Sequence, residues 1–255
     1  MSYTNQFYHR KNFISGLTHK IHKDQTSFWK NGYKIIDILE GQSKISLLEN
    51  LKKIYDEKNK LNFIVKEKLK KEKQLDLREN DNFTNFCVEF LKSDNLIGYL
   101  NYISCNDLVL TGIKIRINSY YSNKSGFWGE HRDTSLFKGN IKGPVPSMIN
   151  LAYYPNFGKK DHKTDQLKIW EGSHKKIFNG KLNILSKLTC KKNIIQSDDN
   201  KLVLFDTSLI HSIAKVKNEE GSLRLIYSFK NKNQVNTLVD DVQKISKWEK
   251  ILNGD

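Results

Sequence analysis

The chain has 255 residues, 38% of them hydrophobic and 11% aromatic, which suits one large globular domain and excludes an intrinsically disordered chain. Its formal net charge of +15 raises the alternative of a nucleic-acid-binding protein, but only five of the 43 basic residues are Arg. Because Arg is the residue preferred for bidentate contacts with phosphates and bases, we interpret the charge as a general bias toward Lys, Asn and Ile.

The chain contains no run of about 18 apolar residues, so no membrane-spanning helix is predicted. The first residues, "MSYTNQFYHRKNF", lack the apolar core of a signal peptide. Cys87, Cys105 and Cys190 are scattered and have neither disulfide-framework nor zinc-site spacing. We therefore expect a cytoplasmic protein.

The first part of the chain, about residues 28–107, predicts a short strand followed by helices. The Asn31-Gly32 pair predicts a turn, and "YKIIDIL" after it predicts the strand. Apolar residues at helical spacing then predict an amphipathic helix: Ile45, Leu48, Leu51, Ile54 and Tyr55. A second amphipathic helix is predicted within residues 83–104, with these apolar residues on one side: Phe83, Phe86, Phe90 and Ile97. The Lys-rich run 66–73 is predicted to be a solvated helix face.

From about residue 108 to residue 230 the pattern changes to short β-rich runs separated by Gly, Asn, Pro and Lys loops. These runs are "LVLTGIKIRINSYY", "SMINLAYY", "QLKIWEG", "KLVLFD" and "SLRLIYSF". Many short strands after a helical block predict a mainly β sandwich or barrel buttressed by helices. Since there is no internal repeat and no Pro/Gly-rich linker, residues 1–255 are predicted to be one domain. Its tail, 231–255, is predicted to contain a short helix.

Two candidate metal ligands lie two residues apart in "GFWGEHRDTSLF". In a strand, His131 and Asp133 project from the same face and can bind one metal ion together. A third ligand is required, and the candidates are His174 in "EGSHKK" and His211 after the buried strand "KLVLFD". Taken alone, His211 is better explained as a core histidine with its hydrogen bonds satisfied than as a metal ligand.

A charged residue in the last predicted strand favours the ligand interpretation. Arg224 in "SLRLIYSF" shares a strand face with Ile226 and Ser228, and a guanidinium in such a strand needs a carboxylate or phosphate partner. That partner is either a bound ligand or an acidic residue on a neighbouring strand. Two His and one carboxylate form the ligand set of non-haem Fe(II) oxygenases, which leave positions open for a chelating cosubstrate and O₂. With 2-oxoglutarate as that cosubstrate, Arg224 suits the carboxylate far from the metal.

At this point the chain resembles the phytanoyl-CoA dioxygenase family of Fe(II)/2-oxoglutarate oxygenases. The similar segments span about residues 28–229 in the family's order: "FWKNGYKIIDIL", "HRDT", "LKIWEGSHKK", "LVLFDTSLIHS" and "SLRLIYSF". The resemblance implies a double-stranded β-helix, Fe(II) bound by His131, Asp133 and His211, and 2-oxoglutarate bound by Arg224. Two positions depart from the family pattern, since Glu171 replaces a usual Pro and Leu223 replaces a frequent second Arg.

The resemblance also implies a reaction class. Related halogenases replace the carboxylate ligand by a small residue, whereas Asp133 is present here, so we expect hydroxylation or a related oxidation of a small molecule. The candidate substrate residues are Trp128, Arg116, Asn118 and Tyr153. Asn150, a buried amide in an apolar strand, is predicted to contact either the carboxylates of 2-oxoglutarate or a neighbouring strand.

Two further segments have expected roles near the site. "EGSHK" is predicted to form a turn in which Ser173 or His174 hydrogen-bonds the backbone. The polar loop 156–166 is either a mobile lid or a solvated loop, and its Lys residues suit an anionic substrate. The alternatives to an oxygenase are a cupin-like barrel with another ligand and a basic protein that binds or modifies nucleic acid.

Overall fold

The structure is a computed structural model, and it describes residues 23–38, 40–57, 64–65, 72–76, 81–93, 96–104, 107–118, 130–133, 148–158, 167–175, 187–213 and 222–231. The helices in these ranges are α2 (Lys23–Asn31), α3 (Gln42–Asp56), α4 (Asp81–Lys92), α5 (Leu96–Ser104) and a 3₁₀ turn, Ser173–Lys175. The first five strands are β1 (Tyr33–Asp37), β2 (Ile64–Val65), β3 (Glu72–Asp76), β4 (Leu108–Asn118) and β5 (Met148–Tyr153). The other strands are β6 (Leu167–Trp170), β7 (Lys192–Ile195), β8 (Lys201–Asp206), β9 (His211–Ile213) and β10 (Ser222–Asn231). No helix among the described residues is long and apolar enough to span a membrane.

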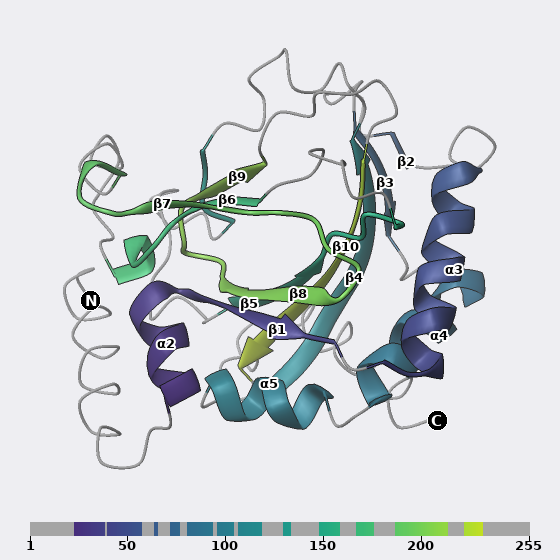
Figure 1. The fold of residues 1–255 in the computed structure, drawn as a ribbon, viewed down its shortest axis with the longest axis horizontal. Coiled ribbons are helices and arrows are strands. Elements are labelled where there is room, and N and C mark those ends of the chain that lie inside the picture. The colour runs from purple at the N-terminus through teal and green to yellow at the C-terminus, as the bar shows by residue number, and fades with distance from the viewer. Residues whose placement is uncertain are drawn as a thin grey trace, which may run out of the picture.

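Two antiparallel sheets form the body of the molecule. The large sheet has the strand order β1-β8-β5-β10-β4-β3-β2, and the small sheet has the order β7-β6-β9. In Figure 1 the small sheet lies on one side of the large sheet, and α3 and α4 lie on the other. One apolar core fills the space between the large sheet and the helices, and a smaller core lies between the two sheets.

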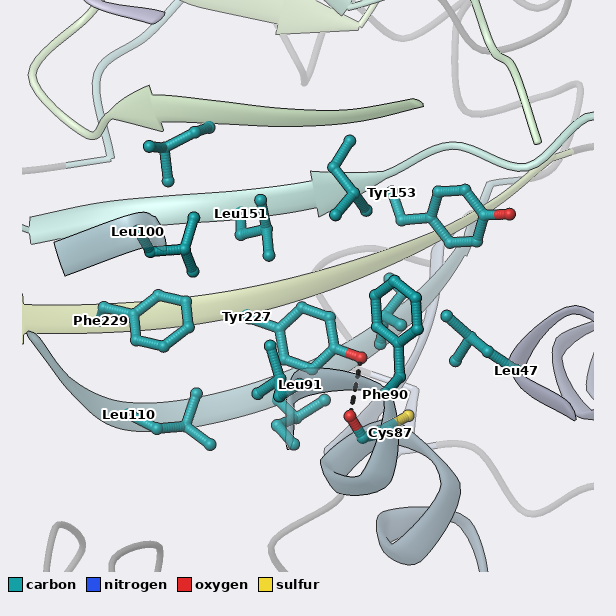
Figure 2. Close-up of a cluster of buried hydrophobic side chains, with 14 of the residues drawn as sticks. Leu47, Cys87, Phe90, Leu91, Leu100, Leu110, Leu151, Tyr153, Tyr227 and Phe229 are labelled. Atoms are coloured by element: carbon teal, nitrogen blue, oxygen red, sulfur yellow. Dashed lines mark hydrogen bonds between the residues drawn. The ribbon is translucent and has the colours of Figure 1, made fainter. Parts of the chain in front are cut away.

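Strand alternation explains both cores. Along β10, Leu223, Leu225, Tyr227 and Phe229 face the helices and are buried in the larger core. Figure 2 shows this core, where the Tyr227 hydroxyl donates to the backbone carbonyl of Cys87 on α4 at 3.1 Å. The residues between them, including Arg224, point to the inner face, toward the small sheet.

The predicted helix of residues 45–55 is present as α3, but its buried side differs from the prediction. Leu47 is fully buried, whereas Ile45 is 45% exposed, so the buried stripe follows Leu47, Leu51 and Ile54. The prediction of one helix over 83–104 was wrong, because α4 ends at Lys92 and α5 begins at Leu96. The sequence between Lys92 and Leu96 is "SDN", residue types that compete with helical hydrogen bonds and favour caps.

The N-terminal part contributes more to the large sheet than its sequence suggested. Besides the predicted β1, which pairs with β8, the strands β2 and β3 extend the sheet beyond β4. Residues 72 and 73 of the Lys-rich run therefore lie in a strand and not on a helix face, while 66–71 lie outside the described residues. The large sheet is thus not confined to residues 108–230. The expected helix in the tail also lies outside the described residues.

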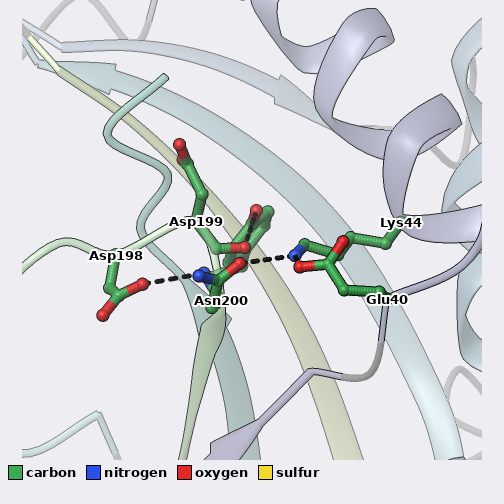
Figure 3. Close-up of polar contacts among 6 residues, drawn as sticks. Glu40, Lys44, Asp198, Asp199 and Asn200 are labelled. Carbon is green, nitrogen blue, oxygen red and sulfur yellow. Dashed lines mark hydrogen bonds and ion pairs between the residues drawn. The ribbon is translucent and has the colours of Figure 1, made fainter. Parts of the chain in front are cut away.

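A polar cluster joins α3 to the turn that precedes β8 (Figure 3). The buried ammonium group of Lys44 donates to the Asn200 side-chain oxygen and to Glu40, the latter at 2.5 Å. Beside it, three backbone N–H groups of residues 156–158 donate to the Asp199 carboxylate at 2.7–2.9 Å. These contacts satisfy a buried charge and the turn after β5 together.

Candidate metal centre

His211 is positioned by a tight turn between β8 and β9. The Asp206 carboxylate at the end of β8 accepts hydrogen bonds from the backbone N–H and the hydroxyl of Ser208, at 2.8 and 2.5 Å. The backbone N–H of Leu209 donates to the Asp206 carbonyl at 2.9 Å. Aspartate favours such turns because its short side chain bonds the backbone two residues later. The chain reverses there and enters β9 at His211, beside Ile169 of β6.

Residues 130–133 form a short segment that pairs with this part of the chain. His131 and His211 lie directly opposite each other and exchange two backbone hydrogen bonds of 2.9 Å each. The backbone N–H of Asp133 donates to the Thr207 carbonyl at 3.0 Å. Because residues in direct register project from one face, the two imidazoles lie side by side, with ring centroids 4.5 Å apart.

The side chains of His131, Asp133 and His211 converge. Asp133 Oδ1 lies 3.3 Å from His131 Nε2 and 3.5 Å from His211 Nε2. One donor atom from each of the three residues lies within 4.8 Å of the others. Ligands bound at about 2.1 Å in adjacent positions are about 3 Å apart, so small movements would let one metal ion be held by all three.

The hydrogen bonds of His211 leave the correct nitrogen for a metal. Its Nδ1 lies 2.9 Å from the Leu209 carbonyl, to which it donates, so Nε2 is the nitrogen directed at Asp133 and available to a metal ion. Desolvation raises the pKa of the Asp133 carboxyl, but the positive charge of protonated His211 and His131 and their hydrogen bonds lower it by more, so the pKa lies well below its ordinary value. A metal ion in place of the imidazole protons could be held by the same three donor atoms.

The cluster is open on one side. The His211 side chain is 8% exposed and packs beside the Phe205 ring, with centroids 5.1 Å apart. His131 and Asp133 are 32% and 36% exposed. A bound ion would therefore have protein on one side and room for further ligands on the other.

Comparisons with known proteins add to this geometry. No family model and no curated protein matches the sequence. SnoN, a non-haem alpha-ketoglutarate-dependent epimerase from nogalamycin biosynthesis, matches with a TM-score of 0.60 and 9% identity over 85% of this chain and 83% of that chain. AviO1 from Streptomyces viridochromogenes Tue57 matches with a TM-score of 0.58 and 13% identity over 82% of this chain and 94% of that chain.

A third similar structure is EctD from S. alaskensis with 2-oxoglutarate and 5-hydroxyectoine. It matches with a TM-score of 0.59 and 11% identity over 83% of this chain and 76% of that chain. The fold is a double-stranded β-helix. At these identities the likeness extends to the fold, and the chemistry must be argued from the chain's own residues.

Arg224 lies on the inner face, as its alternation predicted, and its side chain is 4% exposed. The residue directly opposite it on β4 is Arg116, which faces Gln74 on β3. Two guanidinium groups therefore lie in register on the face that carries the candidate metal centre. Directly opposite residues of an antiparallel pair lie close enough for their side chains to contact one another or a shared ligand.

Asn150 lies next to the metal centre, and its contact is one that the sequence did not predict. Its Nδ2 donates to Asp133 Oδ2 at 2.8 Å, and the side chain is buried. The contact is with a candidate ligand rather than with a strand. Whether Asn150 also contacts 2-oxoglutarate stays a prediction.

The prediction that Tyr153 contacts the substrate was wrong. It lies three residues after Asn150 on β5 and therefore points to the opposite face, where it is fully buried in the larger core. Its hydroxyl donates to the Asp199 carbonyl at 2.8 Å. Trp128 and the side chain of Asn118 lie outside the described residues.

The segment around His174 has the structural role that was predicted. His174 Nε2 lies 2.9 Å from the Trp29 carbonyl in α2, and the Ser173 hydroxyl accepts from the backbone N–H of Ile210 at 2.8 Å. Gly32, which has a φ of +85°, packs so closely that a Cβ there would overlap the His174 ring. Of the predicted 156–166 lid, residues 159–166 lie outside the described residues.

Arg132 was missed as a site residue. It lies between two candidate ligands, points to the other side of the segment and is 8% exposed. Its guanidinium donates to the carbonyls of Ser173, at 3.0 Å, and Ser208. The signal in the sequence was the rarity of Arg, since each of the five invites an explanation.

Proposed function

We propose that this chain is an Fe(II)- and 2-oxoglutarate-dependent oxygenase that acts on a small molecule. The observation that carries the proposal is the convergence of His131, Asp133 and His211 on one open-sided cluster. Two imidazoles and one carboxylate suit Fe(II) and leave positions for a chelating cosubstrate and O₂. The fold supports the proposal, because SnoN and EctD are described with alpha-ketoglutarate dependence and bound 2-oxoglutarate.

Arg224 is the residue we assign to the far carboxylate of 2-oxoglutarate. It is buried on the inner face, and Arg116 in register beside it adds a second positive charge. A guanidinium at this position can bind a carboxylate through two parallel hydrogen bonds. Arg116 and Asn150 remain candidates for contacts with substrate and cosubstrate.

Bound Fe(II) and 2-oxoglutarate would supply oxidative decarboxylation with O₂, which yields succinate and CO₂ and oxidises a C–H bond of the substrate. The chain's own part is to hold the ion with three side chains, to orient the cosubstrate through Arg224 and to position the substrate on the open side. Because Asp133 occupies the carboxylate position that related halogenases lack, we assign hydroxylation or a related oxidation of an unactivated C–H bond rather than halogenation. The many Lys residues suit an anionic substrate.

An anaerobic titration with Fe(II) and 2-oxoglutarate tests the proposal. The wild-type protein should develop the visible charge-transfer band of the iron chelate, and His131→Ala should abolish it. Arg224→Leu should need much more 2-oxoglutarate for the same band, and Arg224→Lys, which keeps a cation, should need less than Arg224→Leu. Circular dichroism establishes that each variant is folded. A folded wild-type protein without the band would contradict the proposal.

A further inference from the structure

Asn150 lies where an amide is hard to explain by strand structure alone. It belongs to β5, within the apolar sequence "MINLAY", with Phe205 of β8 on one side and Ser228 of β10 on the other. Its side chain lies on the inner face and is 6% exposed. A buried amide is costly unless both of its polar ends find partners.

One end of this amide has a specific partner. Asn150 Nδ2 donates to Asp133 Oδ2 at 2.8 Å, a distance typical of a hydrogen bond to a carboxylate. The other end, Oδ1, is buried without a hydrogen-bond partner among the described residues. An asparagine selected to support the strands would use both ends, so the contact with Asp133 is what accounts for an amide at this position.

The contact gives the two oxygens of the Asp133 carboxylate different partners. Oδ2 is held by Asn150, whereas Oδ1 faces His131 Nε2 at 3.3 Å and His211 Nε2 at 3.5 Å. The hydrogen bond therefore fixes the rotation of the carboxylate and turns a single oxygen toward the imidazoles. A carboxylate without this contact is free to turn both oxygens toward a cation.

We propose that Asn150 is a positioning residue that keeps Asp133 a one-oxygen ligand of the metal. The three protein ligands then occupy three coordination positions and leave the rest for cosubstrate and O₂. This inference rests on the proposed function, because it concerns the same metal centre. It differs from a role in binding 2-oxoglutarate, because it acts before any cosubstrate is present.

Titration with Co(II) alone separates these roles, because the visible absorption of Co(II) reports both binding and coordination. Asn150→Leu keeps the size of the side chain and removes both polar ends, and Asn150→Ala is a smaller second variant. Without 2-oxoglutarate, both should bind Co(II) about 10–100-fold more weakly than wild type, with altered band intensities.

The matched control is Asn193→Leu. Asn193 on β7 also donates its Nδ2 to a carboxylate, that of Glu171, away from the candidate ligands. The Asn193→Leu variant loses the same type of contact and should bind Co(II) with the affinity and spectrum of wild type. A loss of affinity in Asn150→Leu but not in Asn193→Leu would identify the contact with Asp133 as the cause.

The outcomes distinguish this inference from the proposed function. If wild type binds no Co(II), or if His131→Ala binds it equally well, the metal centre itself is wrong. If wild type binds Co(II) through His131 but the folded Asn150 variants show the same affinity and spectrum, the metal centre stands and the role of Asn150 is overturned. An effect of Asn150→Leu on 2-oxoglutarate affinity alone would also overturn it.

Discussion

Arg132 connects the ligand segment to the two turns behind it. Its guanidinium bonds the carbonyl of Ser173 in the 3₁₀ turn and that of Ser208 in the turn before His211. One side chain therefore holds both sides of the metal centre from the face opposite to the ligands. Charged donors to buried carbonyls give stronger hydrogen bonds than neutral ones.

Arg132→Met should lower the free energy of unfolding by about 2–3 kcal/mol, because it leaves two buried carbonyls without their charged donor. Chemical denaturation measures the change. The matched control is Lys187→Met, which removes a partly exposed ion pair between Lys187 and Glu130. Glu130 lies in the segment 130–133, which also holds Arg132. Lys187→Met should cost less than about 1 kcal/mol. Equal denaturation midpoints for Arg132→Met and wild type would contradict the assignment.

The sequence predicted which residue types belong to the site better than it predicted their contacts. The three candidate ligands converge for two reasons. The i, i+2 rule places His131 and Asp133 on one face, and the apolar strand β8 leads into the turn that precedes His211. The same rule shows why the prediction for Tyr153 failed. Tyr153 is an odd number of positions after Asn150 on β5, so its side chain lies on the opposite face of the sheet. The Asn150–Asp133 contact joins β5 to the separate segment 130–133, and no local pattern encodes it.

At the scale of the elements, one polar cluster joins the two sheets. The Tyr33 hydroxyl on β1 donates to the Glu171 carboxylate after β6 at 2.7 Å, and Asn193 on β7 donates to both. Glu171 stands at the position where the family that the sequence resembles usually has Pro. Its role here is therefore to accept hydrogen bonds from both sheets.

This cluster makes stability depend on alkaline pH. Burial, and then the hydrogen bond to the Glu171 carboxylate, raise the pKa of Tyr33 to about 12. An unfolded tyrosine loses its proton near pH 10, so the contribution of Tyr33 is complete below about pH 10 and is lost as the pH rises toward 12. The difference in unfolding free energy between wild type and Tyr33→Phe should shrink over that range.

Denaturation at a series of pH values measures this difference. Because the chain has 11 Tyr, the difference in phenolate absorbance between wild type and Tyr33→Phe reports the titration of Tyr33. Glu171→Gln is the control, because it keeps an acceptor oxygen and removes the charge. It should move the pKa of Tyr33 down from about 12. A Tyr33 that titrates near 10 in wild type would contradict the cluster.

Element prediction succeeded where the chain itself carries the pattern. The long runs that became β4, β5, β8 and β10 were predicted because their alternation or apolar length is visible locally. The strands β2, β3, β7 and β9 were not, although β1 and β6 of similar length were, since these four carry no visible local alternation and depend on partners that are distant in sequence. The Lys-rich start of β3 even favoured a helix.

At the scale of the whole molecule, the candidate metal centre is assembled from distant parts of the chain. His131 and Asp133 come from the segment 130–133, His211 follows the turn after β8, and Asn150 comes from the middle of the large sheet. The unfolded chain does not hold these side chains together. A metal ion that binds them should therefore stabilise the folded state specifically.

Thermal unfolding with Co(II) tests this linkage. At about 100 times the dissociation constant, the ion should add about 2.7 kcal/mol to the free energy of unfolding, which raises the Tm of a chain of this size by roughly 5–10 °C. His211→Ala should lose the shift while remaining folded without metal, because a core built from two sheets and the four helices α2 to α5 does not depend on one ligand. Mg²⁺, which prefers oxygen ligands and water, should give no shift. An equal shift in His211→Ala would show that Co(II) acts elsewhere on the chain, and the cluster of His131, Asp133 and His211 would then not be its binding site.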